Sequence, residues 1–269
     1  MPYCATCGER RPSDRKHSLA EFAAENVEAL TSFDGRTIRT YRLLLARPGQ
    51  LTLEFMRGVR LRYLPPLQCF LIVNVLFFLW STATNMRVLD ASIDTHRNNG
   101  IYGPRATRMF AEKVAEQHGD SAVTRREFET VTSAQAKSLV LVMVPLFALG
   151  VAVLTIGSRR RYAVHHIVFS LHFYAYLLIM FAGVLYLLRG LIRILPRSVV
   201  AVMLSSSDDS LLSMVLLAGI AIYLGLALRR AYDLGRVRAA ATAVVASFLV
   251  FLTFVAYRVL LFFTTMAAM

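Results

Sequence analysis

The sequence predicts an all-α protein, a polytopic bundle of about five transmembrane helices. The 269 residues are 56% hydrophobic and have a mean hydropathy of +0.52. Several apolar runs reach or approach the roughly 18 to 20 residues that a helix needs to cross the hydrocarbon core. The 30 Lys and Arg residues, against 17 Asp and Glu, lie largely beside those runs, as residues that set membrane topology do. We therefore expect a bilayer with anionic headgroups as the partner, and no nucleic acid.

The N-terminus contains a pair of cysteines spaced like half of a zinc knuckle. Cys4 and Cys7 are two residues apart, and a structural zinc site needs four ligands. His17 is the nearest further ligand, because Cys69 falls within an apolar run. Free thiols, a zinc half site and a four-thiolate site shared by two chains all stay open.

Short amphipathic helices are expected between the cysteine pair and the first span. Ser18 begins a capping-box pattern, and helices are predicted over residues 18–30, 37–46 and 51–57. Pro48-Gly49 is predicted to separate the last two. Helices with basic faces next to a span generally lie along the membrane surface. The alternative is a small cytosolic cap that folds on itself.

Five apolar segments are predicted to cross the membrane, over residues 67–84, 138–156, 164–188, 211–228 and 240–263. Arginines that precede the first and third segments are expected at the membrane interface: Arg57, Arg60, Arg62, Arg159, Arg160 and Arg161. Pro145 is predicted to kink the second span. Residues 191–204 contain Arg193 and Pro196, so we expect a re-entrant or interfacial segment there.

The remaining long segment, residues 87–137, is polar and is predicted as one folded loop with helices over 106–118 and 125–137. It has no active-site signature. The predicted domain organisation is a knuckle-like N-terminus, interfacial helices, a first span, an extracytoplasmic loop and a four-span bundle, over residues 1–17, 18–65, 66–86, 87–137 and 138–269.

The distribution of arginine and lysine predicts the orientation. The N-terminal segment and the connections after the second and fourth spans are more basic than the loops with which they alternate. Basic connections mark the cytoplasmic side. We therefore expect the N-terminus in the cytoplasm and the C-terminus outside it, with Arg258 extending to the outer interface.

Histidines mark one face of the third predicted span. At about 100° per residue, His165, Phe169, His172, Tyr176 and Gly183 lie on a single stripe. A histidine in hydrocarbon is costly unless it faces other helices or a wet cavity. This stripe should therefore face the protein interior.

Three polar residues on other spans are expected at a depth similar to that of the histidines. Asn74, Tyr223 and Ser247 fall in the cytoplasmic half of their spans, and we expect them to line a cytoplasm-facing polar cavity with the histidine stripe. His166 is expected at the headgroup boundary beside Arg161. Hydrogen bonds that join helices are the alternative role for all these groups.

An ordered set of motifs lies at residues 4–8, 34–40, 48–49, 58–66 and 166–173. In these motifs the chain resembles a bacterial domain-of-unknown-function family of polytopic inner-membrane proteins with a zinc-ribbon-like N-terminus. The family has two cysteine knuckles, and this chain has one. The resemblance implies a location in the bacterial inner (cytoplasmic) membrane and zinc bound by the N-terminal cysteines Cys4 and Cys7. It implies no activity.

Three functions are consistent with the sequence. We expect a non-enzymatic scaffold, assembly or regulatory component, working with a membrane-protein partner or as a homo-oligomer, because no carboxylate is expected at membrane depth. The alternative is a transporter or permease subunit that uses the predicted cavity, although no inverted repeat is visible. A third is a membrane enzyme or a haem or metal carrier; a haem held by two histidines would need a partner histidine that only a dimer could supply.

Overall fold

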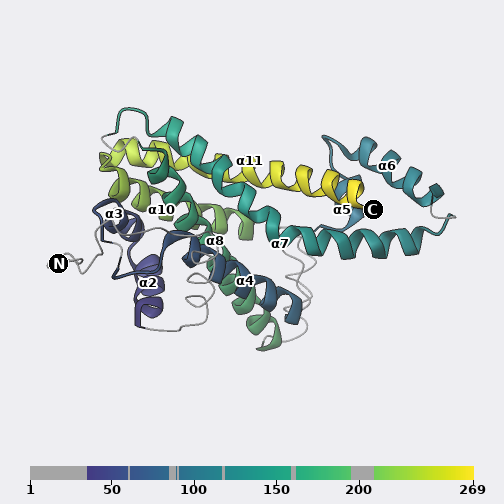
Figure 1. Cartoon of the computed structure of the whole chain (residues 1–269), viewed down its shortest axis with the longest axis horizontal. Coiled ribbons are helices and arrows are strands. Elements are labelled where there is room, and N and C mark those ends of the chain that lie inside the picture. The colour runs from purple at the N-terminus through teal and green to yellow at the C-terminus, as the bar shows by residue number, and fades with distance from the viewer. Residues whose placement is uncertain are drawn as a thin grey trace, which may run out of the picture. The chain divides into compact units, whose positions relative to one another are not determined.

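The computed structural model describes residues 35–59, 61–84, 89, 91–116, 119–158, 162–194 and 209–269. Within these ranges the regular structure is entirely helical, which confirms the predicted fold class (Figure 1). Several predicted sites lie outside the described residues: Cys4, Cys7, His17, Arg60, Arg159, Arg160 and Arg161.

Four described helices are long and apolar enough to cross a membrane: α4 (Pro66–Thr84), α7 (Ser121–Leu154), α8 (Ala163–Ile194) and α11 (Arg236–Ala268). They correspond to the first, second, third and fifth predicted spans, and their length and composition are those of the helices of a polytopic membrane protein. The predicted fourth span lies in helix α10 (Asp209–Tyr232). That helix is not among the four, so its assignment as a span stays a prediction.

Two helices run further than the sequence patterns indicated. Helix α7 is continuous over 34 residues, where we expected a loop helix and a separate span. The polar-to-apolar change in composition does not interrupt it, and Pro145 lies inside it. Helix α8 continues to Ile194, two residues before Pro196, because only the residue next to a proline is strongly disfavoured in the helical conformation.

The chain divides into two compact units, and each is described by itself. The first comprises residues 1–74 and 148–248, and the second comprises residues 75–147 and 249–269. In the first unit, helices α2 (Gly35–Ala46) and α3 (Gln50–Met56) both contact α8, and α3 also contacts α10 (Figure 1).

The turn between α2 and α3 lies where Pro48-Gly49 predicted it. Gly49 has a φ of 75°, a left-handed conformation that glycine adopts without steric cost. The turn is closed by the Gln50 amide, which donates to the Arg47 carbonyl at 3.0 Å. Helix α2 buries Thr37, Thr40 and Leu44, which lie on one face at helical spacing.

In the second unit, an apolar cluster joins the short helices α5 (Ile93–Arg97) and α6 (Gly103–Glu116) to parts of α7 and α11. Its buried members are Ile93, Tyr102, Ala106, Phe110, Phe128, Phe262 and Met266. The cluster surrounds His96, which is 1% exposed. The loop predicted over residues 87–137 therefore contains folded helices with a buried core.

Candidate functional site

The histidine stripe of α8 faces the interior over its first half. Phe169 and His172 are buried, while His165 and Tyr176 are half-buried. Gly183 is exposed, so the buried part of the stripe ends before Gly183, earlier along α8 than the sequence indicated. Helix α8 is contacted by α2, α3 and α10, and Thr52 of α3 lies next to His172.

His172 is joined to the segment that precedes the first span. Its Nδ1 lies 2.9 Å from the hydroxyl oxygen of Thr52 on α3, and both side chains are buried. Its Nε2 is also buried and has no hydrogen-bond partner among the described residues. A buried polar atom of this kind costs free energy unless it is paired.

A small pocket lies against this imidazole. It has a volume of about 130 Å³ and is lined by Leu51, Phe55, Val59, Tyr63, Leu64, Pro65, Pro66 and His172. We call it the His172 pocket. Most of its lining is apolar, and His172 supplies an imidazole without a second partner, so the pocket can hold a small molecule with one hydrogen-bonding group.

Tyr176 and Tyr223, both predicted site residues, lie next to each other in the same unit. Their rings stack with centroids 3.4 Å apart and planes within 10°. The Tyr223 hydroxyl donates to the Leu44 carbonyl at 3.2 Å, which links α10 to α2. Tyr223 and His172 both line a second, smaller hollow, so three predicted site residues are brought together.

Asn74 and Ser247, the other two cavity residues predicted on neighbouring spans, take different places. Asn74 is buried on α4, and Ser247 donates to the Ala243 carbonyl of its own helix at 2.8 Å. Neither lines the hollows described beside His172. The position of a residue along its span predicts its depth in the membrane. It does not predict which side of each helix faces the other helices, so the sequence could not place Asn74 and Ser247 relative to His172.

His166 has a structural partner that the sequence analysis missed. It is buried, and its Nδ1 lies 2.9 Å from the Tyr232 hydroxyl of α10. The two rings stack with planes within 10° and centroids 5.4 Å apart. We expected His166 at the headgroup boundary. The two residues are 66 positions apart, so no local pattern could have indicated the pair.

Residues 35–66, which we call the α2–α3 block, are held by further hydrogen bonds. The Tyr41 hydroxyl donates to the Cys69 carbonyl at 3.0 Å. The Leu64 amide donates to the Thr40 hydroxyl oxygen at 3.0 Å. At the turn, Gly49 packs against Ala227 of α10. A Cβ atom added at Gly49 would lie 2.8 Å from the Ala227 Cα, so no larger residue fits there without a shift. The block is thus fitted to α4, α8 and α10.

The outward side of the block is basic with exposed apolar side chains. Ile38 is 70% exposed and Leu45 is 47% exposed. These two side chains lie on the same face of α2, because they are seven residues apart in a helix. Several arginines of the block are also exposed: Arg36, Arg39, Arg42, Arg47, Arg57 and Arg62. This combination is typical of a surface that contacts lipid headgroups or another membrane protein.

In the second unit, His96 and Arg258 share a buried environment. The Tyr102 hydroxyl lies 2.7 Å from Nδ1 of His96. Burial, together with the nearby charge of Arg258, lowers the pKa of His96 to about 4. The Arg258 guanidinium lies 4.8 Å from the centre of the Phe254 ring. Arg258 is half-buried, so it is engaged by protein groups and not only by the interface.

Among the described residues, no group of three or more His, Cys, Asp or Glu side chains has an arrangement that could hold a metal ion. The predicted zinc ligands Cys4 and Cys7 lie outside the described residues. Cys69 is buried and has a free thiol.

Residues 34–78 match the family described as Protein of unknown function (DUF3667). Comparison with curated proteins and with solved structures gives no match. The matched segment includes α2, α3 and the first part of α4. It supplies every residue that lines the His172 pocket except His172 itself. The predicted resemblance to a domain-of-unknown-function family is confirmed: over residues 34–78 the chain is similar to the DUF3667 family.

Proposed function

We propose that the chain is a non-enzymatic membrane protein that serves as a scaffold, assembly or regulatory component, with the α2–α3 block as its docking element. One observation carries the proposal. The polar groups of the block and of α8 and α10 are used to fix the block in place, as in the Thr52–His172 and Tyr223–Leu44 contacts. A firmly held block suits a docking surface, since little ordering entropy is lost when a partner binds.

The outward face of the block supplies the contact. Ile38 and Leu45 are exposed between arginines, and interfaces are enriched in arginine around apolar centres. The same face would contact anionic headgroups in the absence of a partner protein. The proposed partner is therefore a membrane protein with an acidic surface at the headgroup level, or a second copy of this chain.

Native mass spectrometry of the full chain, purified in mild detergent from its own membrane, tests this proposal. We expect a complex of fixed stoichiometry that dissociates in Ile38→Glu. The matched control is Ile101→Glu, because Ile101 is 80% exposed in the other unit. A wild-type chain found only as a monomer, or a complex equally sensitive to both substitutions, would contradict the proposal.

A small-solute permease is the second candidate, favoured by one observation. His172 lines a pocket, and its buried Nε2 has no hydrogen-bond partner among the described residues; intramembrane histidines can relay protons. Proton flux into proteoliposomes loaded with pyranine tests it. Flux that is lost in His172→Phe but kept in His165→Phe would favour a permease over a scaffold. No flux above that of empty vesicles would rule out a proton pathway.

We further propose that the α2–α3 block lies at the cytoplasmic face of a bacterial inner membrane. Its exposed arginines support this orientation because basic segments are retained in the cytoplasm. A C-terminal alkaline phosphatase fusion should then be active, and a C-terminal fusion to green fluorescent protein should be dark. The reverse result would place the C-terminus in the cytoplasm.

A further inference from the structure

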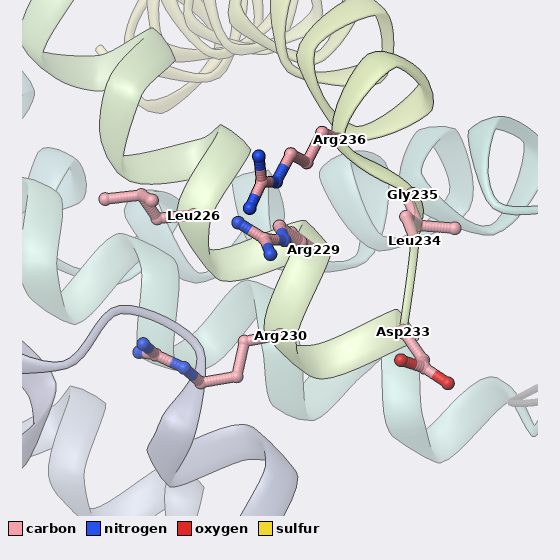
Figure 2. A pocket seen from close by; sticks show the side chains of 7 residues that line it. All are labelled: Leu226, Arg229, Arg230, Asp233, Leu234, Gly235 and Arg236. Carbon is pink, nitrogen blue, oxygen red and sulfur yellow. The ribbon is translucent and has the colours of Figure 1, made fainter.

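The connection between α10 and α11 contains a pocket that the proposed docking role does not use. Its volume is about 600 Å³, and its lining residues are Leu226, Arg229, Arg230, Asp233, Leu234, Gly235 and Arg236 (Figure 2). We call it the basic pocket. Three of its seven lining residues are arginines and one is an aspartate, so the electrostatic potential of the pocket is positive.

The arginines converge on one space. Figure 2 shows the side chains of Arg229, from the last turn of α10, and Arg236, at the start of α11, pointing toward each other. The Asp233 carboxylate points away from both. No carboxylate among the described residues forms an ion pair with Arg229 or Arg236. Two like charges that face each other repel unless an anion lies between them.

Arg230 is used differently. Its guanidinium donates a hydrogen bond to the Pro48 carbonyl at 2.6 Å, and Figure 2 shows its side chain directed away from Arg229 and Arg236. It therefore forms a wall of the basic pocket and links it to the α2–α3 block. Arg229 and Arg236 are left as the groups available to a ligand.

The backbone that carries these arginines is well defined. Asp233 adopts a φ of 55°, and the Leu234 amide donates to the Arg229 carbonyl at 3.2 Å, the pattern of a Schellman helix end. Leu234 and Tyr232 are buried, and Tyr232 bonds to His166. The end of α10 is thus fixed by packing, so the two guanidinium groups need little reorganisation to bind.

The position of the pocket indicates the source of the anion. Helix α11 starts at Arg236 and is a candidate span of 33 residues, about 50 Å at 1.5 Å per residue. That length exceeds the roughly 30 Å hydrocarbon core, so the arginine-bearing end reaches the headgroup layer. The first turn of α11 has no acidic residue, and its free amides also favour an anion.

We propose that Arg229 and Arg236 bind the phosphate of an anionic lipid headgroup in the basic pocket. Guanidinium groups bind phosphate oxygens in pairs. A volume of about 600 Å³ is large for inorganic phosphate but lies in the range of sites for whole small molecules. It accommodates a phosphate together with its attached polar group, and the acyl chains lie beside the spans.

Lipid titration followed by native mass spectrometry tests this site on the full chain in neutral nanodiscs of phosphatidylcholine. We expect the wild type to retain added phosphatidylglycerol, and R229Q/R236Q to bind it at least about tenfold more weakly. The matched control is R108Q/R126Q, which removes two exposed charges from α6 and α7 and should change binding less than about twofold. Equal losses in the two variants would show a general charge effect and overturn the site.

Two further measurements complete the test. R229K/R236K retains charge but lacks the guanidinium fork, so it should bind with intermediate affinity and fold like the wild type. Inorganic phosphate and glycerol 3-phosphate should not displace the lipid at equal concentrations. Displacement by either would assign the pocket to a free phosphate compound. A wild-type chain that retains no more phosphatidylglycerol than phosphatidylcholine would overturn the proposal whether or not the glutamine variant folds, and it would leave the scaffold proposal standing.

Discussion

The hydroxyl oxygen of Thr52 lies 2.9 Å from Nδ1 of His172, across a separation of 120 residues. Thr52 belongs to a short helix before the first span, and His172 lies on the third predicted span. Both side chains are buried. This contact connects the segment that matches the DUF3667 family to helix α8, a candidate membrane span.

Removal of the Thr52 hydroxyl should destabilise the first unit. Thr52→Val keeps the shape of the side chain but leaves Nδ1 of His172 without its partner, at a cost of about 1 to 3 kcal/mol. Unfolding by SDS in mixed micelles measures the free energy. Thr130→Val is the control, because the Thr130 hydroxyl is exposed and bonds within its own helix. Equal effects of the two substitutions would show that the buried contact contributes nothing.

Substitution of Gly49 should be far more damaging than substitution of Gly58. Both glycines have left-handed φ angles, 75° and 86°, so alanine costs about 1 to 2 kcal/mol at either site. At Gly49 a Cβ would also collide with the Ala227 backbone, whereas at Gly58 it meets nothing within 4 Å. Gly49→Ala should therefore unfold at clearly lower SDS than Gly58→Ala. Similar midpoints would mean that the turn does not press against α10.

The second unit should lose stability in mild acid because of His96. Burial and Arg258 lower its pKa from 6.5 to about 4, so the unfolded chain binds more protons than the folded chain between these values. The contribution of the neutral His96 to the free energy of unfolding is therefore fully present above about pH 6.5. It falls as the pH drops toward 4, by on the order of 3 kcal/mol.

A double substitution provides the control for this pH dependence. H96F/Y102F removes the titrating imidazole and its hydrogen-bond partner together, which avoids leaving one of them unpaired. Thermal unfolding followed between pH 7 and pH 4 should then show a flatter stability profile than the wild type. An unchanged slope would assign the acid sensitivity to other groups.

The ion pair between Arg125 and Asp94 should contribute little. The guanidinium makes two hydrogen bonds to the carboxylate, and these lower the pKa of Asp94. Both side chains are exposed, so water and salt screen the attraction. Arg125→Gln should change the free energy of unfolding by less than about 1 kcal/mol. A larger loss would show that the pair orients α5 on α7.

The apolar spans and the short helices α2 and α3 could be predicted because their signals are local. Apolar length identified α4, α7, α8 and α11, and Pro48-Gly49 indicated the turn between α2 and α3. The continuity of α7 could not be predicted in this way. A change from polar to apolar composition marks where a helix meets hydrocarbon, and it does not mark where a helix ends.

The candidate site could be predicted only in part. The cost of a histidine in hydrocarbon correctly indicated that His172 faces inward. The sequence did not indicate that Thr52 contacts His172 or that Tyr232 contacts His166. Both contacts join helices that are distant in the sequence, so they depend on how those helices pack. The basic pocket was missed for a related reason. Arg229 and Arg236 look like ordinary flanking charges in the sequence, and only the turn between α10 and α11 brings them together.

A double-mutant cycle on Thr52 and His172 tests most directly whether the α2–α3 block is fixed to α8. The unfolding free energies of the wild type, Thr52→Val, His172→Phe and the double variant are measured in mixed micelles. We predict a coupling free energy of about 1 kcal/mol, the size found for hydrogen bonds between membrane helices. Free energies that add within about 0.3 kcal/mol would contradict the contact, and with it the block as a fixed docking element.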